Sequence, residues 1–418
     1  MIENSLHLFD AVGIEMEYML VDRETLDVRP VADQLLAELA GRAAVSDFTS
    51  GPITWSNELA LHVIELKTTE PAAKIRSLPS QFEQAIGDLR PALDRLGVRL
   101  LPGGMHPWMD PRNETRLWPH ENRLIYEAYD KIFDCRTHGW ANVQSVHLNL
   151  PFGDEQEFAR LHAAVRIVLP ILPALSAGSP IVDGARTGAS DSRMQHYVEH
   201  CRAVPSLIGR LVPEAIFDEA TYRTEILETI GRDIRPLDPD GVLHPDFLNA
   251  RGAIARFDRG SIELRVMDVQ EYPGADVAIC AAVVAVIKSM VAEQSCPLGR
   301  QQAMPTERLE SILRATSSGA ENAVIDDEDY LSLLGVGDDA VRDGGIRAGD
   351  VWSALLARIR RDDSALSSLY APLQIIADQG TLATRICKSL GDDFTREDLH
   401  NVYDQLSDCL DLWEPFQP

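Results

Sequence analysis

The chain of 418 residues is strongly acidic, with 65 aspartate and glutamate residues against 39 lysine and arginine residues and a formal net charge of -26. This charge disfavours nonspecific binding to nucleic acid or to an anionic membrane, so neither partner is predicted. It does not exclude a nucleotide substrate, because metal ions and a few arginines can make one cleft locally positive. The hydrophobic content of 45% is that of a globular protein with a large core.

The cysteines and the apolar segments indicate a cytoplasmic protein. The six cysteines are scattered without a C-x-x-C pair, which is typical of reduced thiols. The first residues show neither a basic region nor an apolar segment of the secretory kind. The apolar run 277–287 is bounded by Asp276 and Lys288 and is too short to cross a bilayer, so we expect a buried helix there.

The first predicted strand, residues 8–22, carries Glu15 and Glu17 at alternate positions. Side chains on a strand alternate between its faces, so both carboxylates emerge on one side. Residues 58–67 form a second predicted strand, with Glu58 and Glu65 seven positions apart. An uninterrupted strand would send these two to opposite faces, so either Glu58 lies on the preceding turn or a bulge separates them.

The middle of the chain alternates predicted helices and strands. The strand 142–152 presents His147 and Asn149 on one polar face, and the strand 254–268 places Glu263 and Arg265 on a shared side. Residues 178–192 are predicted to form a polar loop, and 178–193 is a candidate lid. Further helices are expected at 77–96, 126–133, 155–177 (kinked by its prolines), 193–230 and 275–294, with a short strand at 98–101.

Beyond about residue 300, amphipathic helices at 306–315, 350–361, 365–379 and 395–412 alternate with acidic connections such as 335–349. We therefore predict a catalytic core over 1–300 and an acidic helical extension over 301–418 that packs on it. The predicted fold class is α+β, with a curved, mostly antiparallel sheet that has helices on one side and a polar face on the other.

The acidic strands favour a divalent metal site. A glutamate pair on a strand usually faces solvent, but apolar residues surround Glu15 and Glu17 on both faces, and buried carboxylates need a partner. Oxygen ligands suit Mg²⁺ or Mn²⁺. Taken alone, His147 is more often a hydrogen-bonded core residue, and Glu263 with Arg265 could be a structural ion pair.

Other chemistries lack their motifs. The sequence contains no P-loop, no G-x-S-x-G and no H-E-x-x-H, and no G-x-G-x-x-G follows a strand. If ATP is used, its phosphates must be held by metal and arginines on a sheet. A second group lacks the tight spacing of a zinc site and is interpreted as a loop packed by aromatic rings; it comprises His106, Trp108, Trp118, His120, His138 and Trp140.

An ordered set of segments resembles the glutamate–cysteine ligase type 2 family, also called the carboxylate–amine ligases. The segments are Gly13–Glu17, Asn57-Glu58 through Leu66, His147–Leu150, Ser179-Pro180 with Thr187-Gly188 and Ser192-Arg193, and Ile262–Asp268. The resemblance covers roughly residues 8–295. It implies a glutamine-synthetase-like sheet that binds ATP, glutamate and magnesium, and a homodimer.

The resemblance also implies roles for individual residues. The expected metal ligands are Glu15, Glu17, Glu58, Glu65, His147 and Glu263; Arg265 and His147 are the expected catalytic residues; Arg193, Thr187, Asn149 and Arg251 are expected to bind substrate or nucleotide. The function expected is ATP- and Mg²⁺-dependent (or Mn²⁺-dependent) amide formation between the γ-carboxylate of glutamate and an amine, with cysteine the first candidate. The alternatives are a metal-dependent amidase or deamidase acting on γ-glutamyl amides, and a non-catalytic nucleotide-binding sensor.

Overall fold

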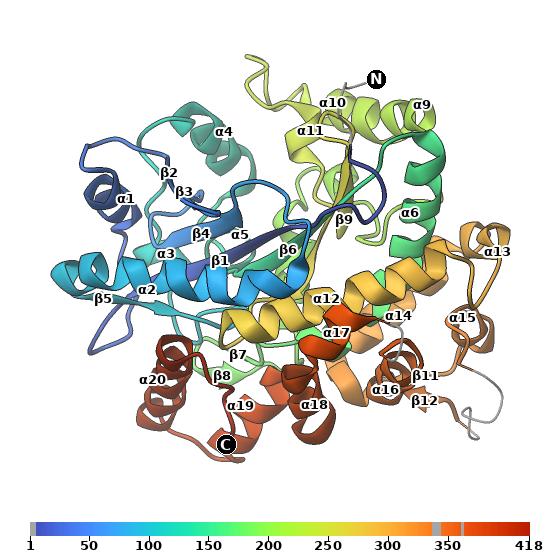
Figure 1. The fold of residues 1–418 in the computed structure, drawn as a ribbon. Coiled ribbons are helices and arrows are strands. Elements are labelled where there is room, and N and C mark those ends of the chain that lie inside the picture. The colour runs from blue at the N-terminus through green and yellow to red at the C-terminus, as the bar shows by residue number, and fades with distance from the viewer. Residues whose placement is uncertain (1–5, 337–343, 361–362) are drawn as a thin grey trace.

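A single eight-stranded antiparallel sheet organises the protein (Figure 1). The computed structural model describes residues 6–336, 344–360 and 363–418. The strand order is β2-β3-β4-β1-β6-β10-β9, and β5 pairs with the second half of β1. The strands are β1 (Gly13–Asp22), β2 (Asp47–Ser50), β3 (Ile53–Asn57), β4 (Val63–Thr68), β5 (Val98–Leu101), β6 (Ser145–Pro151), β9 (Ala253–Arg256) and β10 (Ser261–Asp268).

The two faces of the sheet differ in chemistry, as the alternation in β1 requires. Ile14, Met16 and Tyr18 are fully buried on one face, while Glu15 and Glu17 point to the other. Helix α2 (Leu78–Leu96) and helix α12 (Pro273–Val291) contact each other and cover the apolar face (Figure 1). The predicted mostly antiparallel α+β fold is thereby confirmed.

Two predicted strands differ in the structure. Only the second half of 58–67 is a strand, because β3 ends at Asn57 and β4 begins at Val63, so residues 58–62 form the connection between these two paired strands. The stretch 254–268 divides into β9 and β10 around Gly260, whose φ of 63° suits a glycine in a tight turn. The helix expected at 155–177 is broken at its prolines into α6 (Glu155–Val168), a 3₁₀ turn (Leu169–Ile171) and α7 (Pro173–Ser176).

The connections between the strands up to β9 contain mostly short helices. The segment 178–192 contains the hairpin of β7 (Ile181–Val182) and β8 (Ala185–Arg186). The helices of this half are α1 (Ala32–Ala40), η1 (Ile75–Ser77), α3 (Pro111–Glu114), α4 (Arg123–Phe133), α5 (His138–Ala141), α8 (Ser192–His200), η3 (Pro205–Leu207), α9 (Glu219–Tyr222), the π-helix η4 (Arg223–Leu227), α10 (Glu228–Ile234) and α11 (Pro245–Leu248).

Helix α12 is the central helix of the core. Its 19 residues are long and apolar enough to cross a membrane by length and composition alone, yet 83% of its most apolar window is buried inside the fold. The prediction of a buried helix is confirmed, although the helix extends beyond the run 277–287 at both ends.

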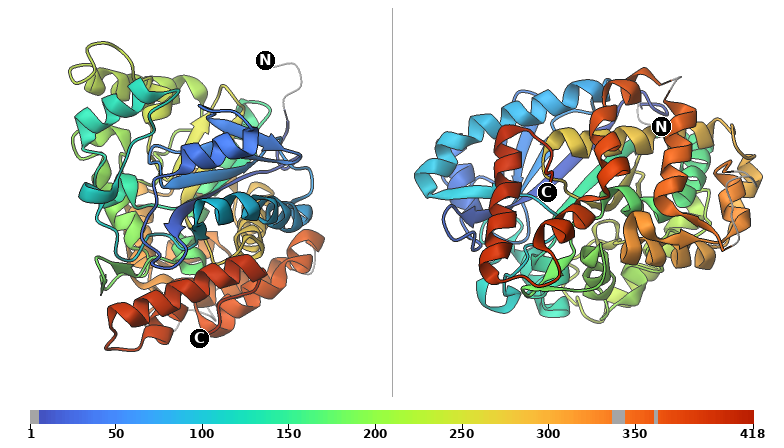
Figure 2. Two further views of the ribbon diagram at one scale, coloured as in Figure 1. Left: turned by 90° about the vertical axis from the view of Figure 1, so that its left-hand side faces the viewer. Right: turned by 90° about the horizontal axis from the view of Figure 1, so that it is seen from below.

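The C-terminal helices form a layer along one side of the core, drawn in orange to red in Figure 2. They attach through buried polar contacts: Trp352 Nε1 donates to the Ile171 carbonyl at 2.7 Å, and Arg385 bonds Glu271 with both side chains 1% exposed. The elements are α13 (Leu298–Gln302), α14 (Thr306–Gly319), η5 (Ala320–Asn322), β11 (Val324–Ile325), α15 (Glu328–Leu333), β12 (Ile346–Arg347), α16 (Ala348–Ile359), α17 (Ser364–Ser368), α18 (Tyr370–Gln379), α19 (Leu382–Leu390) and α20 (Arg396–Leu412).

The division of the chain into 1–300 and 301–418 stays a prediction. Part of the predicted connection 335–349, namely 337–343, and residue 361 of the helix expected at 350–361 lie outside the described residues. Helix α19 had no counterpart among the predicted helices.

Candidate active site

The register of the sheet aligns polar side chains in rows on one face. Glu15 is the cross-strand partner of Lys67 on β4 and of His147 on β6, and Glu17 is the partner of Glu65. In the adjoining row Glu263 of β10 is the partner of Asn149 on β6. Cross-strand partners share a face and lie within reach of each other, so four strands bring these groups together.

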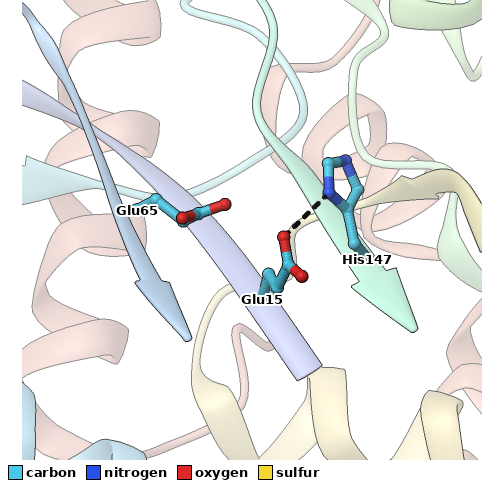
Figure 3. A group of neighbouring side chains, drawn as sticks. All are labelled: Glu15, Glu65 and His147. Atoms are coloured by element: carbon cyan, nitrogen blue, oxygen red, sulfur yellow. Dashed lines mark hydrogen bonds and ion pairs between the residues drawn. The ribbon is translucent and has the colours of Figure 1, made fainter. Parts of the chain in front are cut away.

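The centre of the cluster is formed by Glu15, Glu65 and His147, whose ligand atoms all lie within 4.8 Å of one another (Figure 3). His147 Nδ1 is 3.4 Å from Glu15 Oε2 and 3.6 Å from Glu263 Oε1, and its Nε2 is 4.0 Å from Glu17 Oε1. The imidazole therefore stands among three carboxylates. One divalent ion would fit this mixed oxygen and nitrogen donor set.

Glu58 joins the cluster through the break between β3 and β4. It directly follows β3 and lines the same cavity as Glu17 and Glu65. The break removes the conflict posed by two glutamates seven positions apart on one strand, because Glu58 lies on the turn and not on β4. Burial, followed by the negative charges of Glu65 and Glu17, raises the pKa of Glu58 well above its usual range.

The remaining pKa shifts show that the metal-free cluster binds extra protons. Burial and the charge of Glu15 raise the pKa of Glu65 to about 7. Burial opposes the charged form of His147, but the hydrogen bond to Glu15 and the charge of Glu17 raise the pKa of the imidazole to about 9. Burial likewise acts against ionisation of Glu15, yet His147 and Lys67 hold its pKa below the usual range. A bound cation would take over the role of these protons, so the residues fit a metal.

Arg265 lies beside the carboxylates on β10, next to an irregularity of the strand. The pairing register of β10 with β6 shifts between Leu264 and Met267, which re-aims the side chain in between. Arg265 Nε donates to Glu263 Oε1 at 3.1 Å. Burial raises the pKa of Glu263, but the charges of Arg265 and His147 outweigh it and keep the pKa low. The guanidinium thus supplies a fixed positive charge beside the metal ligands.

The four residues expected to bind substrate or nucleotide are distributed unevenly. Asn149 Nδ2 donates to Glu15 Oε1 at 2.9 Å and so belongs to the cluster. Arg193 is buried, bonds Asp268 and lines the cavity, and its Nη2 has no hydrogen-bond partner among the described residues. Thr187 and Arg251 are not among the described residues that line the cavity. Thr187 is exposed and bonds Ser192, while Arg251 forms two bonds with Glu214, at 2.6 and 2.7 Å.

The cavity above the cluster has a volume of about 570 Å³. Its floor is the polar face of the sheet, and its walls come from α4, α5, α8 and α11, including Tyr129, Trp140, Tyr197 and Phe247. A neighbouring cavity of about 420 Å³ shares Glu15, Lys67 and Arg259 with it. The site is therefore two adjoining compartments that meet at the carboxylate cluster.

Three basic residues of the site were missed by the sequence analysis. Lys67, Arg256 and Arg259 all line the larger cavity, and Arg256 Nη1 lies 3.7 Å from Glu263 Oε2. Lys67 could have been found, because it is two positions from Glu65 on one strand and must share its face. Arg256 and Arg259 depend on the hairpin turn between β9 and β10, which was not foreseen.

The segment 178–192 is not a free lid over the cavity, because it is bonded to the C-terminal helices. Arg186 donates to the Cys387 carbonyl at 2.8 Å, and the Ser190 amide donates to the Ser318 carbonyl at 3.0 Å. The segment is therefore held against the C-terminal helices. Within the second histidine and tryptophan group, edge-to-face ring contacts join His106 to Trp108 and Trp118 to His120, as expected of packed loops.

Comparison with known proteins assigns this sheet and its acidic cavity to an enzyme of the carboxylate–amine ligase class. The sequence model described as glutamate-cysteine ligase family 2 matches residues 11–404. The chain belongs to this family, which confirms the resemblance and extends it into the C-terminal helices. An uncharacterized protein of Archaeoglobus fulgidus is 29% identical over 406 residues, covering 97% of this chain and 100% of that protein.

A named relative and two solved structures are also similar to this chain. A Leifsonia xyli protein provisionally named glutamate–cysteine ligase 2 is 30% identical over 189 residues, covering 44% of this chain and 45% of that protein. Among solved structures, the glutamate–cysteine ligase of Francisella tularensis in complex with AMP has a TM-score of 0.58 at 14% identity, covering 98% of this chain and 90% of that one. The bifunctional glutathione synthetase of Pasteurella multocida has a TM-score of 0.63 at 12% identity, covering 97% and 53%. At these sequence identities, the likeness to the two structures shows only that the fold is similar.

Proposed function

We propose that this enzyme uses ATP, with Mg²⁺ or Mn²⁺, to join the γ-carboxylate of glutamate to an amine, with cysteine the first acceptor to test. The observation that carries the proposal is the convergence of Glu15, Glu65 and His147 within 4.8 Å, with Arg265 beside them in one cavity. This arrangement supports phosphoryl transfer, because that reaction needs cations positioned around phosphate oxygens.

Each group of residues has a role in this reaction. Glu15, Glu17, Glu58, Glu65, His147 and Glu263 are proposed to hold the metal. The metal would supply charge neutralisation for the phosphates and help to orient them. Arg265, kept charged and in place by Glu263, would hold the oxygens of the transferring phosphoryl group. His147 would fix the position of Glu15.

The reaction proceeds in two balanced steps. An oxygen of the γ-carboxylate of glutamate attacks the terminal phosphorus of ATP, the bond to ADP breaks, and an acyl phosphate forms. The amine nitrogen then attacks the acyl carbon, phosphate leaves with the bonding electrons, and the nitrogen loses a proton. The acyl phosphate must be protected from water, and the aromatic wall of Tyr129, Trp140 and Phe247 serves that purpose.

The proposal also includes the kind of substrate, the cellular location and the oligomeric state. All substrates are small molecules, and the six free cysteines are compatible with the reducing cytoplasm that we propose as the location. A homodimer is proposed from the family resemblance, and light scattering of the purified protein tests it.

The decisive experiment measures ADP release with ATP, Mg²⁺ and glutamate against a panel of amines that includes cysteine. Release that depends on the amine, together with a γ-glutamyl product, supports the proposal. Glu15→Ala should reduce the rate by at least about 100-fold because the cluster loses a central ligand. Glu24→Ala is the matched control, since Glu24 is exposed in the turn after β1. Full activity in Glu15→Ala would refute the assignment.

The same panel separates the alternatives. Release of glutamate from γ-glutamyl amides without net ATP turnover would identify an amidase or deamidase. Tight nucleotide binding without turnover of any amine would identify a sensor.

A further inference from the structure

Lys67 stands within the carboxylate cluster, although the sequence analysis gave it no role. It is the cross-strand partner of Glu15, and its Nζ donates to Glu65 Oε2 at 2.6 Å. Ser56 Oγ donates to the same oxygen, also at 2.6 Å. The ammonium group is thus held against Glu65 on the floor of the site.

Lys67 lies where the two cavities meet, a position that it shares with Arg259 but not with Arg265 or Arg193. Lys67 lines both the cavity of about 570 Å³ and the neighbouring one of about 420 Å³. Its side chain is 38% exposed, against 22% for Arg265, so the ammonium keeps access to the space above the sheet. Glu15 and Lys67 both line the smaller cavity, so a molecule that occupies it can contact both residues.

Lys67 has hydrogen-bond donors left for an anion. An ammonium group has three donors, and one of them is used by Glu65. Arg265 donates twice to Glu263 and also approaches Tyr197, and Arg193 bonds Asp268 through its Nε. A lysine ammonium is a compact point charge that binds phosphate well.

We propose that Lys67 is a phosphate-contacting residue, which binds the terminal phosphates of the nucleotide at the junction of the two cavities. The inference rests on the proposed function, because it requires a nucleoside triphosphate in this site. It adds a positive group on β4, while Arg265 lies on β10, and β1 and β6 run between these two strands on the same sheet. The phosphates then lie between Lys67 and Arg265 on the polar face. The nucleoside then occupies the smaller cavity, next to Thr54, Thr69 and Phe152.

The test compares the affinities for ATP and AMP, measured by calorimetry in the presence of Mg²⁺ on the full chain. Lys67→Met should weaken ATP binding by about 10-fold to 100-fold, the effect of removing a charged hydrogen-bond partner, and leave AMP binding unchanged. Lys67→Arg should retain most of the ATP affinity because it keeps the charge. Lys74→Met is the matched control, because Lys74 is exposed seven residues further along.

The outcomes separate this inference from the proposed function. If the wild-type protein binds no ATP, the proposed function fails and the inference fails with it. If the wild-type protein binds ATP and Lys67→Met binds it equally well, only the inference fails. If Lys67→Met weakens ATP and AMP by the same factor, or loses its cooperative thermal unfolding, Lys67 is a structural partner of Glu65 and the inference is overturned.

Discussion

The substitution Glu65→Gln should stabilise the metal-free protein while it impairs the site. Glu65 is 6% exposed, and burial and Glu15 raise its pKa from 4.5 to about 7. A raised carboxyl pKa means that the folded state keeps a proton that the unfolded state releases. The free energy of unfolding therefore falls as the pH rises from about 4.5 to about 7, and stays at the lower value above that range.

The size of the effect follows from the shift. One pKa unit corresponds to about 1.4 kcal/mol, so the ionisation of Glu65 costs the folded state about 3 kcal/mol at most. Glutamine has the same shape and cannot ionise, but it gives up the ion pair with Lys67. We expect Glu65→Gln to be about 1–3 kcal/mol more stable than the wild type at pH 8 without metal.

Urea denaturation of both proteins from pH 5 to pH 8, in the presence of a chelator, measures this difference. The stability advantage of Glu65→Gln should grow with pH and level off above about pH 7. Glu70→Gln is the control, because Glu70 is exposed just beyond the end of β4. A difference that is flat with pH, or a variant less stable than the wild type at pH 8, would refute the reasoning. Added Mg²⁺ should raise the unfolding temperature of the wild type more than that of the variant.

Other predictions concern the metal site and the core. Mn²⁺ affinity, measured by calorimetry, should increase by more than about tenfold per pH unit between pH 6 and pH 8, most steeply below pH 7, because Glu65 and His147 must release protons with pKa values of about 7 and about 9. A constant affinity would contradict this assignment. Asp268→Asn leaves the buried Arg193 without its anion and should lower the free energy of unfolding by about 3–5 kcal/mol in urea titrations, and a loss below about 1 kcal/mol would speak against it. Trp352→Ala should cost about 3–5 kcal/mol and lower the single unfolding temperature of the whole chain, whereas two separate calorimetric transitions would show that the C-terminal helices unfold independently.

The arrangement of the acids could be predicted from the sequence where it depends on local alternation. Glu15 and Glu17 share a face because strand geometry requires it, and the same argument placed His147 with Asn149. No single-strand pattern states which strands are neighbours, so the pairing of β1 with β4 and β6 was not predicted, and only the family resemblance implied that these residues gather around one metal site. Local periodicity predicted the faces, and the resemblance predicted that they meet.

The errors lie where a turn interrupts a run of β-compatible residues. Nothing in the apolar pattern of 58–67 marks the start of β4 at Val63, so the sequence left two placements open for Glu58, and the structure has the one on the turn before β4. The turn at Gly260 hid Arg256. The roles of Arg251 and Thr187 stay predictions, and the structure places both outside the cavity lining. The attachment of 178–192 to Cys387 and Ser318 joins distant parts of the chain, which local patterns cannot reveal.

The place of β1 in the sheet has a consequence for how the protein is made. β1 is synthesised before β4, β5 and β6, with which it pairs, and β10 completes the site only when residue 268 has been added. A nascent chain shorter than this exposes the row of glutamates on β1 and β4 without Arg265. Because such long-range pairings close slowly, we expect folding to be limited by arrival of the hairpin of β9 and β10 and not by formation of the helices.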